Sequence, residues 1–193
     1  MICLGVKMKK ILCVCLSSTI QRSITFEKVQ LEHVNRSEHY VEHASGKAVN
    51  SARVLNQLEK GCVKTICPLG ENNAQQFLKL AELDELDISY VTIPGSTRIC
   101  WTLLDRTAGT TTELVVGEPI VQISQQPEVK LLKLLVETLP SVDGVLLAGS
   151  RPNIWSKDLY AAIAGMTKDA GKIFLADYIG DDLQLTLKSV TPD

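Results

Sequence analysis

Ile11-Leu-Cys-Val-Cys-Leu16 is an unbroken apolar run near the start of the chain, and it predicts a β-strand that is buried on both faces. Further short runs of strand length lie at residues 63–67, 145–148 and 172–176, and Pro68-Leu-Gly70 is expected to end the first of these. Segments with the composition or periodicity of helices lie at residues 47–59, 73–86, 127–138, 156–168 and 181–188. Buried strands that alternate with helices predict an α/β fold, in which helices cover both faces of a mostly parallel sheet.

The composition limits the class of protein. The 193 residues are 45% hydrophobic and 22% charged, which is typical of a folded protein, and we expect residues 1–193 to form a single α/β domain. The formal net charge of −2 provides no basic excess to bind a nucleic-acid backbone or an anionic membrane. No apolar run approaches the roughly 20 residues that a membrane span needs. The composition therefore disfavours both nucleic acid and membrane as partners.

Two stretches follow a different pattern, in which apolar residues alternate with polar ones. They are residues 23–43 and 87–116, and Pro94-Gly95 and Gly109 mark turns within the second stretch. Alternation of this kind predicts strands with one buried face, so we expect the two stretches to pair as a small antiparallel sheet. We place these β-lid insertions at residues 17–43 and 87–116, over a ligand cleft at the carboxyl ends of the parallel strands.

The chain has six cysteines, and most of them lie in apolar runs, where a thiol behaves as a small buried hydrophobe. Their spacing fits neither a zinc site nor a disulfide framework, which favours reduced thiols and a cytoplasmic location. His33, His39 and His43 lack the spacing of a metal site, so no metal site is predicted. The first 18 residues faintly resemble a signal peptide, but their apolar core is too short for one, and Met8 is an alternative start to Met1.

Ala44-Ser-Gly-Lys-Ala-Val-Asn50 is the first candidate for a ligand site, because it opens the helix predicted at residues 47–59. Small residues allow a ligand to approach the backbone closely, and the first free N–H groups of a helix, together with Lys47, suit a phosphate. The segment is not a Walker A loop, since the first glycine of that motif is absent and Ala48 follows the lysine. The alternative reading is a helix start with a solvated lysine.

Three other positions are candidates for ligand contacts, each with a structural alternative. Ser150 follows the strand predicted at residues 145–148 and either binds an anion or caps a turn. Arg98 follows the Pro94-Gly95 turn and either reaches a phosphate from the lid or is a surface residue. Asp177 follows the strand predicted at residues 172–176 and either contacts a nucleotide or metal or caps a helix.

In this order, the segments resemble the PfkB (ribokinase-like) carbohydrate kinases, and within them the phosphofructokinase and tagatose-6-phosphate kinase branch. The resemblance runs from about residue 10 to residue 193. It is carried by Ser45-Gly-Lys-Ala-Val-Asn-Ser-Ala-Arg-Val-Leu55, Thr97-Arg98-Ile99, Thr112-Glu-Leu114, Gly117-Glu-Pro119, Ala148-Gly-Ser-Arg-Pro152, Leu175-Ala-Asp-Tyr-Ile-Gly180 and Thr191-Pro-Asp193.

The resemblance implies a three-layer ribokinase-like fold and a kinase reaction. That reaction is the transfer of the γ-phosphoryl group of ATP, with Mg²⁺, to a hydroxyl of a ketohexose phosphate such as fructose 6-phosphate, fructose 1-phosphate or tagatose 6-phosphate. Family positions carried over to this sequence place Asp177 and Asp193 on the cofactor side. They surround the sugar phosphate with Gln21, Gly46, Lys47, Asn50, Arg98 and Ser150.

The sequence also departs from the family pattern. Gln21 stands where the family has an aspartate that binds sugar hydroxyls, Ala48 replaces the glycine after the lysine, and Pro68-Leu-Gly-Glu71 replaces a Gly-Gly pair. The family's Gly-Ala-Gly-Asp segment, which holds the catalytic base, does not occur in residues 1–193, so no catalytic residue is assigned.

Two readings therefore stay open. One is a PfkB sugar kinase that is inactive as this 193-residue chain, and the other is a non-catalytic sugar-phosphate-binding module. An unrelated Rossmann-like nucleotide binder is disfavoured, because no Gly-x-Gly-x-x-Gly follows the first strand. An unpaired sheet edge would favour association, so we expect a homodimer formed through the lid or through that edge.

Overall fold

The computed structural model describes residues 9–115, 117 and 126–193. Within them, a five-stranded sheet has the strand order β5-β4-β1-β8-β9, and each neighbouring pair is parallel. In chain order its strands are β1 (Ile11–Val14), β4 (Val63–Gly70), β5 (Ile88–Ile93), β8 (Gly144–Ala148) and β9 (Ile173–Asp177). The predicted mostly parallel sheet is confirmed.

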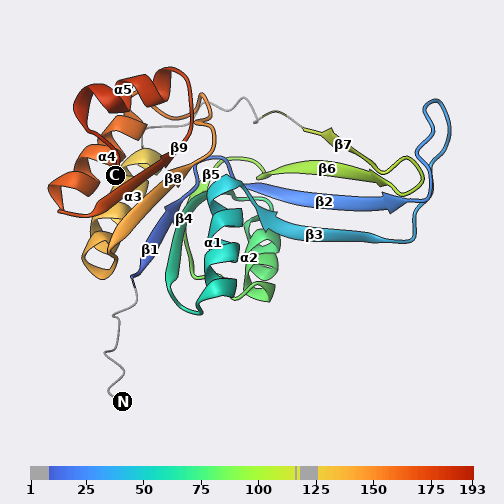
Figure 1. The fold of residues 1–193 in the computed structure, drawn as a ribbon, viewed down its shortest axis with the longest axis horizontal. Coiled ribbons are helices and arrows are strands. Elements are labelled where there is room, and N and C mark those ends of the chain that lie inside the picture. The colour runs from blue at the N-terminus through green and yellow to red at the C-terminus, as the bar shows by residue number, and fades with distance from the viewer. Residues whose placement is uncertain (1–8, 116, 118–125) are drawn as a thin grey trace, which may run out of the picture.

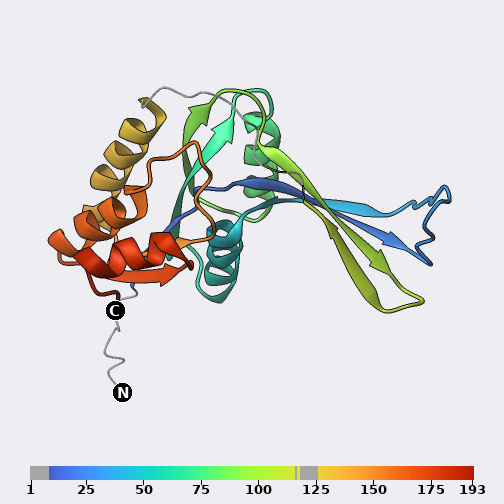
Figure 2. The ribbon, with the colours of Figure 1, turned by 90° about the horizontal axis from the view of Figure 1, so that it is seen from above.

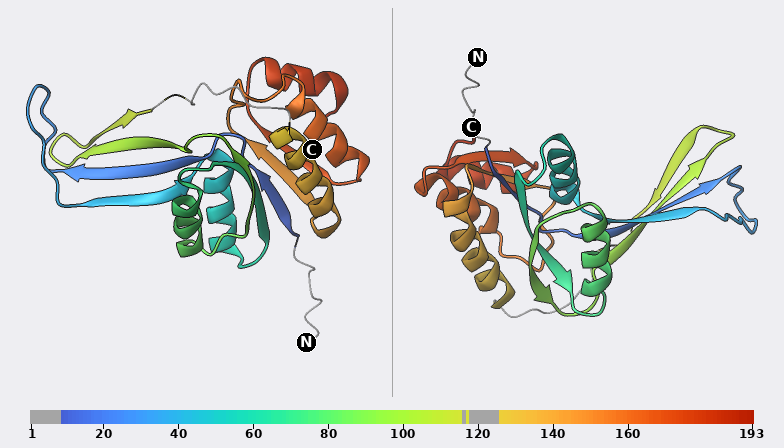
Figure 3. Two further views of the ribbon diagram at one scale, coloured as in Figure 1. Left: turned by 180° about the vertical axis from the view of Figure 1, so that it is seen from behind. Right: turned by 90° about the horizontal axis from the view of Figure 1, so that it is seen from below.

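Helices cover both faces of this sheet, as predicted (Figures 1 and 3). One side carries α1 (Lys47–Leu58) and α2 (Ala74–Leu83); the other carries α3 (Gln126–Thr138), α4 (Leu159–Asp169) and α5 (Asp181–Ser189), with the short 3-10 helix η1 (Leu139–Ser141). The central strand β1 explains why both faces need cover. Its Cys13 belongs to the core under α1 and α2, whereas Leu12 and Val14 belong to the core under α3 and α4. None of the helices in the described residues is both long and apolar enough to span a bilayer.

A second sheet projects from this body (Figures 1 and 2). Among the described residues it has four strands in the order β3-β2-β6-β7, and we call it the lid. The strands are β2 (Thr19–Phe26), β3 (Tyr40–Ser45), β6 (Arg98–Asp105) and β7 (Thr110–Leu114). The lid is joined to the body where β2 and β6 begin and β3 ends.

Two expectations about the lid are wrong. Its central pair, β2 and β6, is parallel, with Thr19 opposite Arg98, so the lid is a mixed sheet and not an antiparallel one. The expected insertion at 87–116 also includes β5, which pairs in parallel with β4 and belongs to the body. The reason is that β5 is an edge strand: Val91 and Ile93 are buried in the core while Tyr90 and Thr92 are exposed, and the resulting alternation imitates a one-sided lid strand.

Pro68 does not end β4, contrary to expectation, since the strand continues to Gly70. Thr65 donates its N–H to Asp87 on the β5 side, and because successive residues of a strand face opposite neighbours, position 68 faces the β1 side. The strand β1 has already ended there at Val14, so the missing proline N–H costs no ladder hydrogen bond.

Gly70 brings the start of β6 close to the end of β4. A Cβ atom at this position would lie 2.2 Å from the backbone nitrogen of Thr97, whereas the Gly70 N–H donates to Thr97 Oγ1 at 2.9 Å. The absence of a side chain therefore allows the contact that places Arg98, the next residue, at the base of the lid.

The five cysteines among the described residues are free and buried, as expected; they are Cys13, Cys15, Cys62, Cys67 and Cys100. Burial raises the pKa of the Cys13 thiol to about 12, and it also raises the pKa values of Cys15 and Cys67. These thiols stay protonated and pack as core residues. The sixth cysteine, Cys3, lies outside the described residues.

Candidate functional site

A pocket of about 260 Å³ lies where the lid meets the body, and we call it the base pocket. The first residues of β2 and β6, the end of β3 and the start of α1 all contribute to it. It is lined by Thr19, Gln21, Ser45, Gly46, Lys47, Asn50, Arg98, Cys100, Trp101, Glu113 and Val115. Five of the six residues predicted for the sugar phosphate, namely Gln21, Gly46, Lys47, Asn50 and Arg98, are thus brought together.

Gly46 makes the junction between β3 and α1 possible. Its φ of 127° lies in a region that favours glycine. A Cβ atom there would lie 2.6 Å from Cys15 Sγ and 2.9 Å from the carbonyl oxygen of Ser17. The helix therefore begins directly against the loop that follows β1, and its first turn borders the base pocket.

Two of the first amides of α1, those of Ala48 and Val49, are engaged inside the protein, which the sequence did not suggest. Burial raises the pKa of the Cys15 thiol, and backbone N–H groups of Ser17, Val49 and Ala48 beside the sulfur oppose that rise. The thiol of Cys15, the residue after β1, thus satisfies donors that a bound anion would otherwise use. The positive character of the base pocket comes mainly from side chains.

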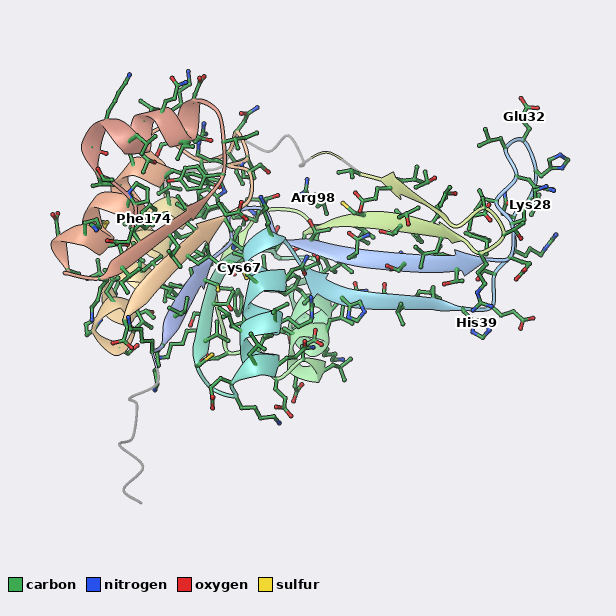
Figure 4. The ribbon with its side chains drawn as sticks, in the orientation of Figure 1. Lys28, Glu32, His39, Cys67, Arg98 and Phe174 are labelled. Atoms are coloured by element: carbon green, nitrogen blue, oxygen red, sulfur yellow. The ribbon has the colours of Figure 1, made fainter. Side chains whose placement is uncertain are left out.

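Two of these side chains are cations that enter from different parts of the fold. Lys47 stands at the first turn of α1, and its Nζ donates to Asp177 Oδ1 at 2.8 Å. Both side chains of this ion pair are more than half exposed, so the pair contributes little stability and leaves the lysine free to turn towards a ligand. Arg98 begins β6 and donates through Nε to Thr19 Oγ1 at 2.8 Å, at the junction of lid and body (Figure 4).

Neutral groups complete the lining. Gln21 donates through Nε2 to Thr102 Oγ1 at 2.7 Å, which holds its side chain along the lid. Asn50 accepts a hydrogen bond from Ser45 Oγ at 3.1 Å through Oδ1. Two cations beside amide groups can bind a phosphate dianion and hydrogen-bond hydroxyls of the group that carries it.

The other predicted positions lie outside this pocket. Ser150 is exposed and does not line it, although the preceding Gly149 lies beside Lys47, where a Cβ atom would come within 3.3 Å of that side chain's own Cβ. Asp177 ends β9, forms an ion pair with Lys47, and lines a neighbouring pocket together with Lys47 and Asn50. Asp193 lies near the opposite end of β9, where its carboxylate accepts hydrogen bonds from the Lys168 ammonium and from the Phe174 N–H, and these contacts lower its pKa.

These placements do not build a nucleotide site. The two carboxylates assigned to the cofactor side lie at opposite ends of β9, and each is paired with a lysine. No group of three or more metal-ligating side chains converges within residues 9–115, 117 and 126–193. The described residues therefore do not fit an ATP–Mg²⁺ complex, and no reaction step is derived through one.

Five lining residues were not assigned a role from the sequence: Thr19, Cys100, Trp101, Glu113 and Val115. Glu113 could have been predicted as a site residue, because it lies in the Thr112-Glu-Leu114 segment that carries the family resemblance. Its carboxylate can accept hydrogen bonds from sugar hydroxyls but opposes a second anion. Trp101 stacks under the guanidinium of Arg22, 4.8 Å from the ring centroid, and so connects the pocket to the outer part of the lid.

Known proteins resemble the chain in both sequence and fold. The tagatose-6-phosphate kinase of Staphylococcus epidermidis is 29% identical over 181 residues, which is 93% of this chain and 56% of that protein. The structure of phosphofructokinase-2 from Escherichia coli in complex with fructose 6-phosphate matches with a TM-score of 0.81 at 16% identity, over 96% of this chain and 60% of that one. The tetrameric inhibited form of the same enzyme matches with a TM-score of 0.82 at 16% identity, again over 96% and 60%.

The chain spans just over half the length of the curated relatives that it matches. The structural matches share the fold of the body and the lid, which confirms the ribokinase-like architecture expected from the sequence. A sequence profile of the pfkB family carbohydrate kinases matches residues 9–192, almost the whole chain. This chain belongs to the pfkB family of carbohydrate kinases.

Proposed function

We propose that the base pocket binds a phosphorylated ketohexose, with fructose 6-phosphate, fructose 1-phosphate and tagatose 6-phosphate as the candidate ligands. The observation that supports this most directly is the convergence of Lys47 and Arg98 on one pocket from two separate elements. In this assignment both cations bind the phosphate, Asn50 and Gln21 hydrogen-bond hydroxyls, and Gly46 admits the ligand close to the backbone. Ser150 is assigned to the rim, beside Lys47.

The names of the relatives support the same class of ligand, since they include a tagatose-6-phosphate kinase and a phosphofructokinase bound to fructose 6-phosphate. PfkB sugar kinases use ATP, generally with Mg²⁺. We propose that this chain is a phosphotransferase by descent. The free buried thiols support a cytoplasmic location.

Calorimetry with the 193-residue chain tests the binding proposal. We expect fructose 6-phosphate and tagatose 6-phosphate to bind, and unphosphorylated fructose to bind at least about tenfold more weakly, because each charge-assisted hydrogen bond contributes about 1.5–3 kcal/mol. Raising the salt concentration should lower the affinity for the phosphorylated sugars and leave the affinity for fructose unchanged. Equal affinity for fructose and its phosphate would refute a phosphate site.

The same preparation tests whether the isolated chain has kinase activity. We expect no ADP release from ATP, Mg²⁺ and fructose 6-phosphate above that of a Lys47→Ala variant, because the Gly-Ala-Gly-Asp segment that holds the family's base does not occur in this sequence. Binding without turnover fits both readings of the isolated chain. Turnover above the control would show that these residues contain a base and would overturn the expected inactivity.

We also propose that the chain associates through the lid. The lid extends from the body with little cover (Figure 2). It carries a pocket of about 360 Å³ whose lining includes Ile24, Phe26, Tyr40 and Trp101. Exposed apolar surface of this kind favours association, and a related phosphofructokinase-2 forms a tetramer. Light scattering should give the mass of a dimer, and Tyr40→Lys should shift it towards the monomer. A monomeric wild-type chain at micromolar concentration would contradict the proposal.

A further inference from the structure

The side chain of Arg53 forms a fork between three elements beside the base pocket. From the second turn of α1 it donates through Nε to Asp84 Oδ2 at 2.7 Å, at the end of α2. Its Nη1 donates to Asn50 Oδ1 at 2.9 Å, and its Nη2 donates to the carbonyl oxygen of Ala44 in β3. Only 18% of this side chain is exposed, and Arg53 does not line the pocket itself.

The contact with Asn50 fixes which way that amide points. A guanidinium has only N–H donors, so the Asn50 atom that it contacts must be the oxygen. Ser45 Oγ donates to the same oxygen at 3.1 Å, which makes the assignment consistent from a second direction. The amide nitrogen, Nδ2, donates no hydrogen bond within the described part of the chain, and Asn50 lines the base pocket. The arrangement leaves two N–H donors for a ligand.

We propose that Arg53 is a positioning residue for the sugar-phosphate site, and that it acts by holding the Asn50 amide with its nitrogen directed to the ligand. The inference rests on the proposed function, because it needs a ligand that accepts hydrogen bonds. The fork also ties the end of lid strand β3 to α1 through Ala44, so it keeps the lid-side and helix-side walls of the pocket in register. A lysine cannot take this role, since one ammonium cannot span three separate acceptors.

Variants of the two ends of the fork separate positioning from simple stability. Arg53→Lys keeps the charge and loses the fork, and we expect binding of fructose 6-phosphate to weaken up to about tenfold, the loss of one neutral hydrogen bond between Asn50 and a sugar hydroxyl. Asp84→Asn weakens only the far end of the fork and keeps the contacts with Asn50 and Ala44. We expect it to lower the thermal midpoint about as much as Arg53→Lys does, while affinity changes less than about twofold. Equal losses of affinity in both variants would overturn the proposal.

A double-mutant cycle tests whether Arg53 acts through Asn50. Asn50→Ala alone is expected to weaken binding about tenfold, and adding Arg53→Lys to it should weaken binding no further, because no amide remains to be oriented. If the loss of affinity in the double variant equals the product of the losses in the two single variants, the mechanism is refuted.

A measurement without ligand keeps this inference separate from the proposed function. The side-chain amide resonances of Asn50 should shift or broaden in Arg53→Lys and stay unchanged in Asp84→Asn. If wild type binds no sugar phosphate but the resonances respond as expected, the proposed function fails while the orienting contact stands. Resonances that are unchanged in Arg53→Lys would refute the contact itself.

Discussion

Replacing Lys47 and Arg98 together with alanine is expected to lower the affinity for fructose 6-phosphate by about 100- to 10,000-fold, the product of the about 10- to 100-fold loss expected from each single change. The two cations approach the base pocket from α1 and from β6, so neither can replace the other. A phosphate that loses both must be desolvated with only neutral donors to compensate it. Calorimetric titration of the single and double variants measures these losses.

A matched control removes the same charge just beyond the far ends of the same two elements. Lys60 follows the far end of α1 and Arg106 follows the far end of β6, and neither lines the base pocket. The double variant Lys60→Ala, Arg106→Ala has the same net charge as the test variant, and we expect its affinity to stay within about threefold of wild type because screening weakens distant charges. Similar losses in the two double variants would mean that overall charge, and not a pocket, binds the ligand.

Gly46→Ala is expected to destabilise the fold by roughly 4 kcal/mol, because it combines an unfavourable φ with a steric overlap that the surroundings cannot relieve. The new methyl group would lie 2.6 Å from Cys15 Sγ and 2.9 Å from a backbone oxygen, both within the packed centre of the molecule. Urea denaturation followed by circular dichroism gives the free energy of unfolding. A refolded variant should also lose sugar-phosphate binding, since the start of α1 must move.

Gly61→Ala provides the comparison for this result. Gly61 also has a positive φ, of 74°, but a Cβ atom there would meet nothing within 4 Å, so only the conformational cost of about 1 kcal/mol is expected. In a Cys15→Ala background, Gly46→Ala should lower the free energy of unfolding by less, because the nearer of the two steric overlaps is then removed. Equal destabilisation by the two glycine variants would show that φ alone, without the close approach, explains Gly46.

The body of the fold follows from local patterns in the sequence. The apolar run at residues 11–16 predicts a strand with two buried faces, and β1 indeed lies between two cores. The helix at 47–59 is equally evident, because small residues mark its start and apolar residues recur at helical spacing. Lys47 and Arg98 are recognisable as cations placed after a break in structure, even though their convergence depends on the tertiary fold.

Pairing between distant strands is where local patterns fail. An edge strand of a parallel sheet and a strand of a one-sided lid both alternate in polarity, so β5 cannot be told from a lid strand by its residues alone. The donors at the start of α1 show a second limit. Their partner, Cys15, is more than 30 residues away in sequence and looks like an ordinary core residue. Arg53 likewise reads as a surface arginine until the fold brings Asp84 and Ala44 to it.

The parallel seam between β2 and β6 has a consequence for how the molecule assembles. Thr19 and Arg98 are 79 residues apart in the chain, and the segment between them contains α1, β4, α2 and β5. Closing so large a loop costs entropy, which the intervening elements can reduce only after they have folded. The pairing of β2 with β6 should therefore form last during folding and be lost first on unfolding. The ability to bind the ligand would then be acquired only in the last folding step.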